Sequence, residues 1–433
     1  MRLKTLLHTK FAHNTSWIIA SRIYQLGVNL AVSVLTSRYL GPENYGLLQY
    51  AASFAALLTA FCTLGIGDVM VPALIASPRE QGQLLGTAIV FRFGASLLSM
   101  TTVCLAVWAI NPDQPLTVWV AAIYGSSMVL QSLEAVKYFY QKQLMSKVTG
   151  LLTMATRTVV ALYKILLLLF QKDVLWFAFS NVLDHALFGV LLLICYRRHR
   201  QPGQQLRFDR SAGRTLLSQS CPFILSGFMV ALYGQMDKIM IKHLLTETQV
   251  GHYAVALLLC NVWTFVLTAL VDSARPVILE QFSGNEPQYR QKLAQLYRAL
   301  MYISFAVAAA MTLLAKPLVQ LLYGEAYLGA VNALRILPWG TAFSYLGVAR
   351  SIWTVPHGQQ HLEKYLAFIG AAANVALNLL LIPTWGICGA AVAAVLTQII
   401  TNFLCGLLFR PLRQNTALIL RALRPGPILF REK

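Results

Sequence analysis

Twelve long apolar runs alternate along this chain with short polar connections, and the basic residues gather in every second connection. Each run is close to the roughly 20 residues that an α-helix needs to cross about 30 Å of hydrocarbon. Because such a helix satisfies all of its backbone hydrogen bonds internally, the pattern predicts an all-α protein that crosses a membrane many times. The predicted spans are residues 16–37, 46–67, 87–109, 116–136, 149–170, 174–196, 217–241, 251–273, 296–315, 331–353, 365–383 and 386–408.

The basic residues also predict which side of the membrane each connection faces. With the N-terminal segment counted as connection zero, the even-numbered connections hold 23 Lys and Arg residues, and the odd-numbered ones hold only Arg38, Lys172, Lys242 and Lys316. Cytoplasmic loops are enriched in Lys and Arg, so both termini are predicted to be cytoplasmic. These loops face anionic lipid and account for the formal charge of +19, so nucleic-acid binding is not expected.

An internal repeat relates the first part of the chain to the second. Residues 37–46, where span one passes into span two, align without a gap with residues 242–251, where span seven passes into span eight. Further on, residues 68–72 and 272–276 share an Asp and a Pro at the same spacing. The repeat indicates that the chain is built from two related halves.

The long basic connection 197–214 separates these halves, which gives an N-terminal six-helix lobe at 1–205 and a C-terminal six-helix lobe at 206–433. Each half holds an even number of spans, so the repeats have the same orientation and are related by an axis along the membrane normal. Pseudo-symmetric repeats of this kind favour a transporter with a central cavity between its lobes.

Enzyme signatures are absent from the sequence. It contains no phosphate-binding loop, no zinc-spaced Cys/His cluster and no nucleophile elbow, and the short outer connections leave no room for a catalytic domain. The chain is therefore predicted not to be an enzyme and to need no cofactor or metal.

Eight cations fall within the predicted spans, where each costs about 2.5–3.5 kcal/mol at a helix centre. Arg157 and Lys164 stand seven residues apart on one face of span five, and span six brings Asp184 to an intermediate depth. One reading is a structural Asp184–Arg157 bridge with a snorkelling Lys164. The other is a positive, water-filled cavity, since one carboxylate cannot neutralise two cations. The eight are Arg22, Arg92, Arg157, Lys164, Lys238, Arg275, Arg335 and Arg350.

Polar side chains also recur at helical spacing on three other spans. Interhelical hydrogen bonds explain any one such stripe, whereas several together fit the lining of a lumen. The stripes are Arg22, Gln25 and Asn29 on span one, Asn261, Thr264, Thr268, Asp272 and Arg275 on span eight, and Asn374 and Asn378 on span eleven. The predicted substrate-binding residues are Arg22, Gln25, Asn29, Arg92, Arg157, Lys164, Asn261 and Arg275, and the candidate coupling carboxylates are Asp184, Glu134 and Asp272.

Four segments spread over nearly the whole chain resemble the polysaccharide-biosynthesis flippases, that is, Wzx-type O-antigen translocases. They are residues 38–46 (RYLGPENYG), 236–241 (MDKIMI), 322–327 (LYGEAY) and 378–391 (NLLLIPTWGICGAA). The resemblance places the chain in the superfamily that also holds multidrug and toxin extrusion carriers and lipid II flippases. It implies a V-shaped bundle of two six-helix lobes that works by alternating access.

The resemblance further implies a substrate and a location. The substrate would be an undecaprenyl-diphosphate-linked oligosaccharide, an O-antigen or other surface-polysaccharide unit, handed from the inner to the outer leaflet of the bacterial inner membrane. A polysaccharide polymerase and a chain-length regulator are the expected protein partners. One alternative stays open, a cation-coupled multidrug extrusion carrier of the same fold, which would be expected to have an acidic or apolar lumen. The short outer loops argue against a second rival, a membrane-embedded glycan polymerase or ligase.

Overall fold

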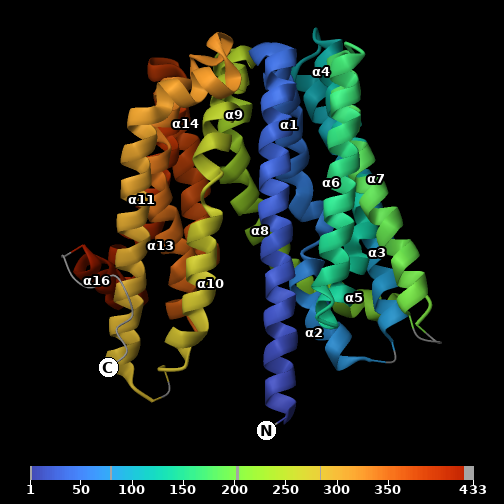
Figure 1. Ribbon diagram of the computed structural model, residues 1–433, viewed down its shortest axis with the longest axis vertical. Coiled ribbons are helices and arrows are strands. Elements are labelled where there is room, and N and C mark those ends of the chain that lie inside the picture. Colours follow the sequence, from blue (N-terminus) through green and yellow to red (C-terminus); the bar gives the residue numbers. More distant parts are fainter. Residues whose placement is uncertain (1, 79, 201–203, 283, 424–433) are drawn as a thin grey trace. The chain divides into compact units, whose positions relative to one another are not determined.

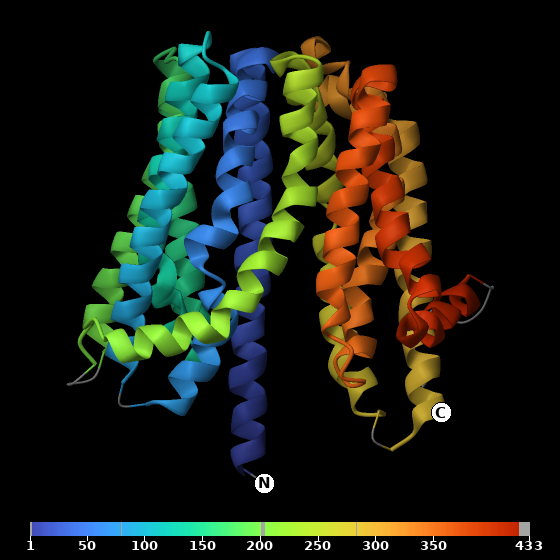
Figure 2. The same cartoon turned by 180° about the vertical axis from the view of Figure 1, so that it is seen from behind.

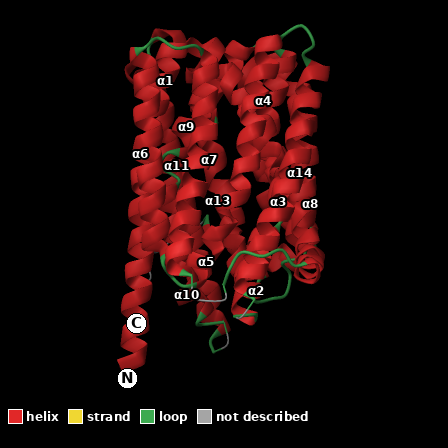
Figure 3. Ribbon diagram, turned by 90° about the vertical axis from the view of Figure 1, so that its right-hand side faces the viewer, coloured by secondary structure: helices red, strands yellow, loops and turns green. Residues whose placement is uncertain are grey.

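The computed structural model describes residues 2–78, 80–200, 204–282 and 284–423. Residues 201–203 of the predicted inter-lobe connection and the cations Arg79, Arg424, Arg431 and Lys433 lie outside the described residues. Within the described ranges every regular element is a helix (Figure 3), which confirms the predicted all-α class.

The chain forms two compact units, residues 1–231 and 232–433. Unit 1 holds the first seven α-helices and the beginning of the eighth (Figure 1). Its elements are α1 (Arg2–Thr63), α2 (Ile66–Ala76), α3 (Gln81–Ile110), α4 (Pro115–Leu130), the 3₁₀ segment η1 (Gln131–Val136), α5 (Lys137–Lys142), α6 (Ser146–Leu169), α7 (Val174–His199) and α8 (Arg210–Leu244).

Unit 2 begins inside α8 and contains the remaining elements. They are α9 (Glu247–Asn261), α10 (Phe265–Leu279), α11 (Glu286–Tyr323), η2 (Glu325–Tyr327), α12 (Ala330–Ile336), α13 (Pro338–Thr354), α14 (Leu362–Ile399), the π-helical η3 (Ile400–Leu404), α15 (Cys405–Leu408), η4 (Arg410–Leu412) and α16 (Arg413–Ala422).

Helices cover nearly all of the twelve predicted spans. Nine helices in the described ranges are long and apolar enough to cross a membrane, and two of them contain two spans each. In these two the chain reverses at a glycine with positive φ, at Gly41 (72°) next to Pro42 and at Gly386 (58°) shortly after Pro383. Such φ values favour glycine because it has no Cβ. The span at 331–353 is the twelfth and is divided between the shorter helices α12 and α13.

The boundary between the units lies 26 residues beyond the predicted 205/206 division, because the first part of α8 packs on unit 1. Residues 204–209 run along α3, and a Cβ at Gly82 or Gly86 would come within 2.2 Å and 2.5 Å of the carbonyl oxygens of Gln205 and Arg207. Figure 2 shows the first part of α8 crossing the ends of the unit 1 helices. The glycines therefore let the connection lie directly against α3.

Each unit is held together by an apolar core, and apolar side chains also cover much of its outer surface. Unit 1 has a core around Met70, Leu85 and Phe139, and unit 2 has one around Tyr297 and Trp353. Many large apolar side chains of the spans remain exposed, among them Leu98 (70%), Leu169 (72%) and Leu313 (80%). Exposed apolar faces on this scale are stable in lipid rather than in water.

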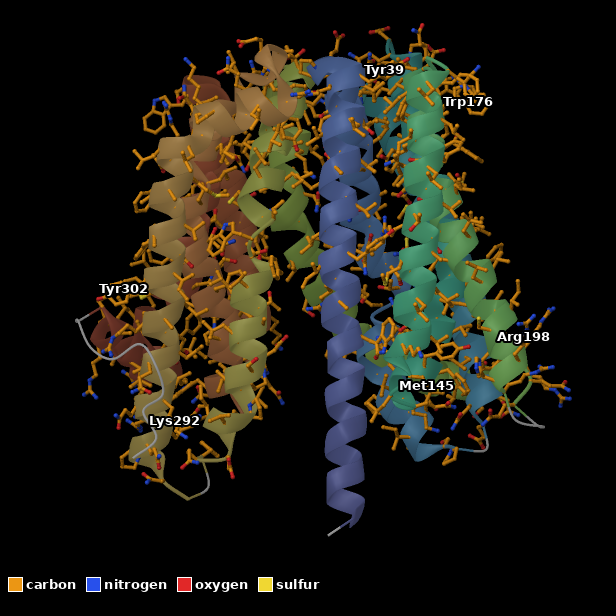
Figure 4. The ribbon with its side chains drawn as sticks, in the orientation of Figure 1. Tyr39, Met145, Trp176, Arg198, Lys292 and Tyr302 are labelled. Atoms are coloured by element: carbon orange, nitrogen blue, oxygen red, sulfur yellow. The ribbon has the colours of Figure 1, made fainter. Side chains whose placement is uncertain are left out.

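The ends of unit 1 agree with the predicted alternation of connections. In Figure 4 Tyr39 and Trp176, which adjoin odd-numbered connections, lie at one end, whereas Met145 and Arg198, at even-numbered ones, lie at the other. The chain is a multi-pass membrane protein.

Candidate functional site

Helices α6 and α7 carry an ion pair near the middle of α6. Arg157 Nη1 lies 3.0 Å from Asp184 Oδ2, with the arginine side chain 36% exposed and the aspartate side chain 8% exposed. Lys164 is half-buried about 10 Å further along the same face of α6 and interacts with both charges. Two cations and one carboxylate leave one positive charge. The structure thus brings together the three charged residues that the sequence placed on adjoining spans.

A second charged group lies where span four changes from α-helix to 3₁₀ helix. Glu134 Oε1 is 2.6 Å from His185 Nδ1, and Glu134 Oε2 is 4.0 Å from Lys137 Nζ. His185 follows Asp184 on α7. Two of the three candidate coupling carboxylates are therefore found at this point of α7: Asp184 belongs to the helix, and Glu134 contacts it through His185. The sequence did not reveal the Glu134–His185 contact, because it depends on how α4 and α7 are rotated against each other.

Arg92 lies in the interior of unit 1 and is only 2% exposed. Its Nη2 atom donates a hydrogen bond of 3.1 Å to the backbone oxygen of Gln131, at the start of η1. The charge of Glu134 is close enough to interact with it. The substrate contact predicted for Arg92 stays a prediction, and in this structure protein encloses its guanidinium.

The stripe on α1 presents its members to different surroundings. Arg22 and Asn29 are exposed and Gln25 is half-buried. The adjoining face of α1 packs on α6, since the Tyr24 and Thr158 hydroxyls are 2.5 Å apart and Ser21 is buried beside Gly150. The polar stripe is therefore adjacent to the packed face and not part of it.

The stripe on span eight follows an interrupted helix in unit 2. α9 ends at Asn261 and α10 begins at Phe265, and the Thr264 carbonyl accepts a hydrogen bond of 2.9 Å from the Tyr345 hydroxyl. Asn261 and Asp272 are exposed. Interrupted membrane helices expose backbone polar groups that can contact substrates or ions.

Arg275 differs from the rest of that stripe because it contacts a neighbouring helix. Its Nη2 atom donates a hydrogen bond of 3.0 Å to Ser351 Oγ, so it joins α10 to α13. The structure does not bring the three predicted site residues of this stripe, Asn261, Asp272 and Arg275, to one common partner.

Asp237 on α8 is a buried carboxylate that the sequence analysis did not assign to the site. Its Oδ1 accepts hydrogen bonds from the side-chain amides of Asn374 (2.9 Å) and Asn378 (2.7 Å), and its Oδ2 accepts one from the Tyr253 hydroxyl (2.7 Å). The side chain of the next residue, Lys238, is also buried. The four-residue spacing of Asn374 and Asn378 was a usable signal, although it did not reveal which charge they serve.

A pocket of about 450 Å³ opens in unit 1 between α2, the start of α3 and the start of α8. Its lining includes Glu80 and Asp209, and Asp209 Oδ1 accepts hydrogen bonds from the backbone amides of Ser211 and Ala212 in the first turn of α8. No predicted site residue lines this pocket.

Among the residues with described placement, no group of three or more His, Cys, Asp or Glu side chains is positioned to hold a metal ion. Several of the described charged side chains of each unit form ion pairs or hydrogen-bond networks. Such arrangements can bind an anion or exchange a proton.

Two solved structures share this architecture. One is an inward-facing multidrug resistance MATE family transporter of the MOP superfamily, with 15% identity, 92% of this chain and 96% of that chain covered, and a TM-score of 0.72. The other is the lipid II flippase MurJ in an inward closed conformation, with 14% identity, 95% and 91% covered, and a TM-score of 0.72. At these identities the likeness shows the fold.

Sequence comparison shows the family. An uncharacterized membrane protein of Methanocaldococcus jannaschii is 21% identical over 419 residues, which cover 89% of this chain and 81% of the relative. Residues 35–332, more than half of the chain, match the family described as polysaccharide biosynthesis protein. This chain therefore belongs to the polysaccharide biosynthesis protein family.

Proposed function

We propose that the protein is a flippase that moves an undecaprenyl-diphosphate-linked oligosaccharide, an O-antigen or other surface-polysaccharide unit, from the inner to the outer leaflet by alternating access. The observation that carries this proposal is the family match over residues 35–332. The protein would act in the bacterial inner membrane beside a polysaccharide polymerase and a chain-length regulator.

Cationic side chains support a diphosphate-bearing substrate. The Arg157–Lys164–Asp184 group keeps one uncompensated positive charge, and Arg157 is partly exposed. Arginine presents a fork of donors that matches phosphate oxygens. We assign the diphosphate to Arg157 and Lys164, with a further contact from the predicted cation Arg22 of the same unit. Arg275 of unit 2 stays a predicted substrate-binding residue.

The sugars need neutral donors and acceptors. Gln25, Asn29 and Asn261 carry side-chain amides that are exposed or half-buried. An amide offers both donors and acceptors, so it can bind hydroxyl groups in several orientations.

The proposal is tested by reconstituting the purified protein into liposomes that contain a fluorescent undecaprenyl-diphosphate oligosaccharide. We expect the label to cross the bilayer faster than in protein-free liposomes and faster than a labelled phospholipid in the same vesicles. Equal rates for the two lipids would indicate bilayer leakage, and no acceleration would contradict the flippase assignment.

The alternative function is cation-coupled multidrug extrusion, which the MATE-like fold and the buried carboxylate Asp237 favour. Cells that overproduce the protein would then tolerate organic cations at higher concentrations, and the liposomes would move such a cation but not the labelled lipid. The opposite result supports the flippase.

Topology is the first consequence to check. Because 23 Lys and Arg residues lie in even-numbered connections and 4 in odd-numbered ones, both termini and the 197–214 connection should be cytoplasmic. Reporter fusions at Asn111, Lys172 and Lys316 are expected to report the outside, and a fusion after Arg200 the inside. An external signal at Arg200 would overturn the arrangement of twelve spans.

The second consequence to check is proton coupling through Asp184. An arriving diphosphate would draw Arg157 and Lys164 away from Asp184, and the unpaired carboxylate would then bind a proton more readily. In liposomes with an imposed pH gradient, Asp184→Asn should lose the gradient dependence while substrate binding stays measurable. If Asp184→Asn responds like the parent, coupling would pass to Glu134 or Asp272.

A further inference from the structure

The short helix α16, which follows span twelve, exposes cations and leucines on one side. Figure 2 shows it in red, turned away from the direction of the long helices of unit 2. Its buried side chains Leu418 and Ile419 belong to the apolar core of unit 2. Arg413 and Leu420 stand seven residues apart, so they share the opposite face of the helix, and both are exposed. A face that exposes an arginine and a leucine together suits neither water alone nor hydrocarbon alone.

Four hydrogen bonds hold α16 and its C-cap against α11. The donors are Arg290, Tyr297, Arg298 and Tyr302, and their acceptors, at 2.6–3.5 Å, are the side-chain oxygens of Gln414 and Asn415 and the carbonyl oxygens of Ala422 and Leu423. Predicted span nine begins at residue 296, between the first and the second of these donors. Figure 4 shows Tyr302 near α16, whereas Lys292 lies further toward the start of α11. The contacts therefore fix α16 at the boundary where α11 enters the membrane.

The apolar surface of span twelve continues onto this helix. Leu408, the last residue of α15, is 74% exposed, and Leu404 and Leu407 before it are exposed as well. Leu420 and Leu423, on α16 and just after it, are also exposed. Exposed leucines beside the end of a membrane span are typical of helices that lie in the membrane interface with one side in the acyl chains.

The exposed cations of the same segment lack acidic neighbours in sequence. Residues 405–423 contain Arg410, Arg413 and Arg421 and no Asp or Glu. All three arginines are exposed. Glu286, the acidic residue at the adjoining start of α11, is engaged with Arg290 at 2.6 Å. Arginine donors match phosphate oxygens, and basic residues next to a membrane span are attracted to anionic headgroups.

We propose that residues 409–423 form a docking surface for anionic phospholipids of the surrounding bilayer. Arg410, Arg413 and Arg421 contact the headgroup phosphates, and Leu420 and Leu423 pack among the acyl chains. Arg413 and Arg421 lie about 12 Å apart along the helix axis, so they contact separate headgroups. This surface is independent of the proposed flippase activity, because bilayer phospholipid and not the transported oligosaccharide occupies it.

The test uses the full chain purified in detergent and stripped of bound lipid. Phosphatidylglycerol is added in one series and phosphatidylcholine with the same acyl chains in another. Native mass spectrometry counts the bound lipid, and thermal unfolding gives the Tm. We expect more phosphatidylglycerol than phosphatidylcholine to stay bound, with a saturable rise of Tm for the anionic lipid. Equal binding of the two lipids would overturn the proposal, and so would inorganic phosphate that raises Tm as much as phosphatidylglycerol does.

Variants separate this surface from the other basic parts of the chain. Arg421→Gln should weaken phosphatidylglycerol binding about fivefold, the contribution of one basic residue near anionic lipid. The triple variant with Arg410→Gln, Arg413→Gln and Arg421→Gln should lose most of the preference for phosphatidylglycerol. Lys316→Gln, which removes an exposed cation near the opposite end of α11, should keep that preference.

The single variant also guards against a folding defect in the triple one. Arg413 Nε donates a hydrogen bond of 2.9 Å to the Leu407 carbonyl at the end of span twelve, so Arg413→Gln removes a structural contact. If the triple variant does not fold, the phosphatidylglycerol titration of Arg421→Gln decides. An affinity equal to that of the parent in that titration counts against the docking surface.

Discussion

Arg157→Ala should lower transport of the lipid-linked oligosaccharide at least about 30-fold in proteoliposomes, since losing a charge-assisted contact with a diphosphate costs about 2 kcal/mol or more. Arg157 is partly exposed and leaves a positive charge uncompensated beside Asp184. The amount of protein in the membrane should stay near that of the parent. Arg157→Lys should restore part of the activity, because it keeps the charge but loses the fork of donors.

The competing interpretation is that Arg157 and Asp184 only join α6 to α7. Removing Arg157 would then leave the buried carboxylate of Asp184 without its counter-charge, which destabilises the protein. In that case Arg157→Ala and Asp184→Ala would both fail to accumulate, and the double variant would recover. If Arg157→Ala loses transport at a normal protein level, the result supports anion binding. If the protein level falls in both single variants and recovers in the double variant, the result supports a structural Arg157–Asp184 bridge.

Asp237→Ala should destabilise the protein by about 3 kcal/mol or more, because it leaves three buried hydrogen-bond donors without their acceptor. It would leave Lys238 buried and the donors of Tyr253, Asn374 and Asn378 without their acceptor. Thermal or denaturant unfolding of the purified protein measures the change. Asp237→Asn should be milder, since the amide keeps one acceptor oxygen.

The matched control is Asp272→Ala, which removes an exposed aspartate of the same unit. Its free energy of unfolding should stay within about 0.5 kcal/mol of the parent, as for most exposed substitutions. If Asp237→Ala unfolds at the same denaturant concentration as Asp272→Ala, the Asp237 network does not stabilise unit 2.

Some of these contacts could be anticipated from sequence and others could not. Arg157 and Lys164 repeat at seven residues, so they share one face of α6 in any α-helix, and Asp184 follows on the next span. By contrast, the contacts of Glu134 with His185 and of Asp237 with Asn374 join residues 51 and 137 positions apart. Contacts of that kind depend on how each helix is rotated about its axis. An apolar span has few polar residues from which this rotation could be predicted.

The sequence by itself determined the twelve spans, their alternation and the family, because the bilayer requires long apolar helices and sorts basic residues to one side. Only the tertiary structure decided that α8 begins on unit 1, where glycines at 82 and 86 admit the connecting chain. It also decided which charges are paired, as Asp184 is with Arg157, and that Arg92 is enclosed and donates a hydrogen bond to the Gln131 carbonyl. Pairing follows from side-chain packing between helices, which hydropathy and charge counts do not specify.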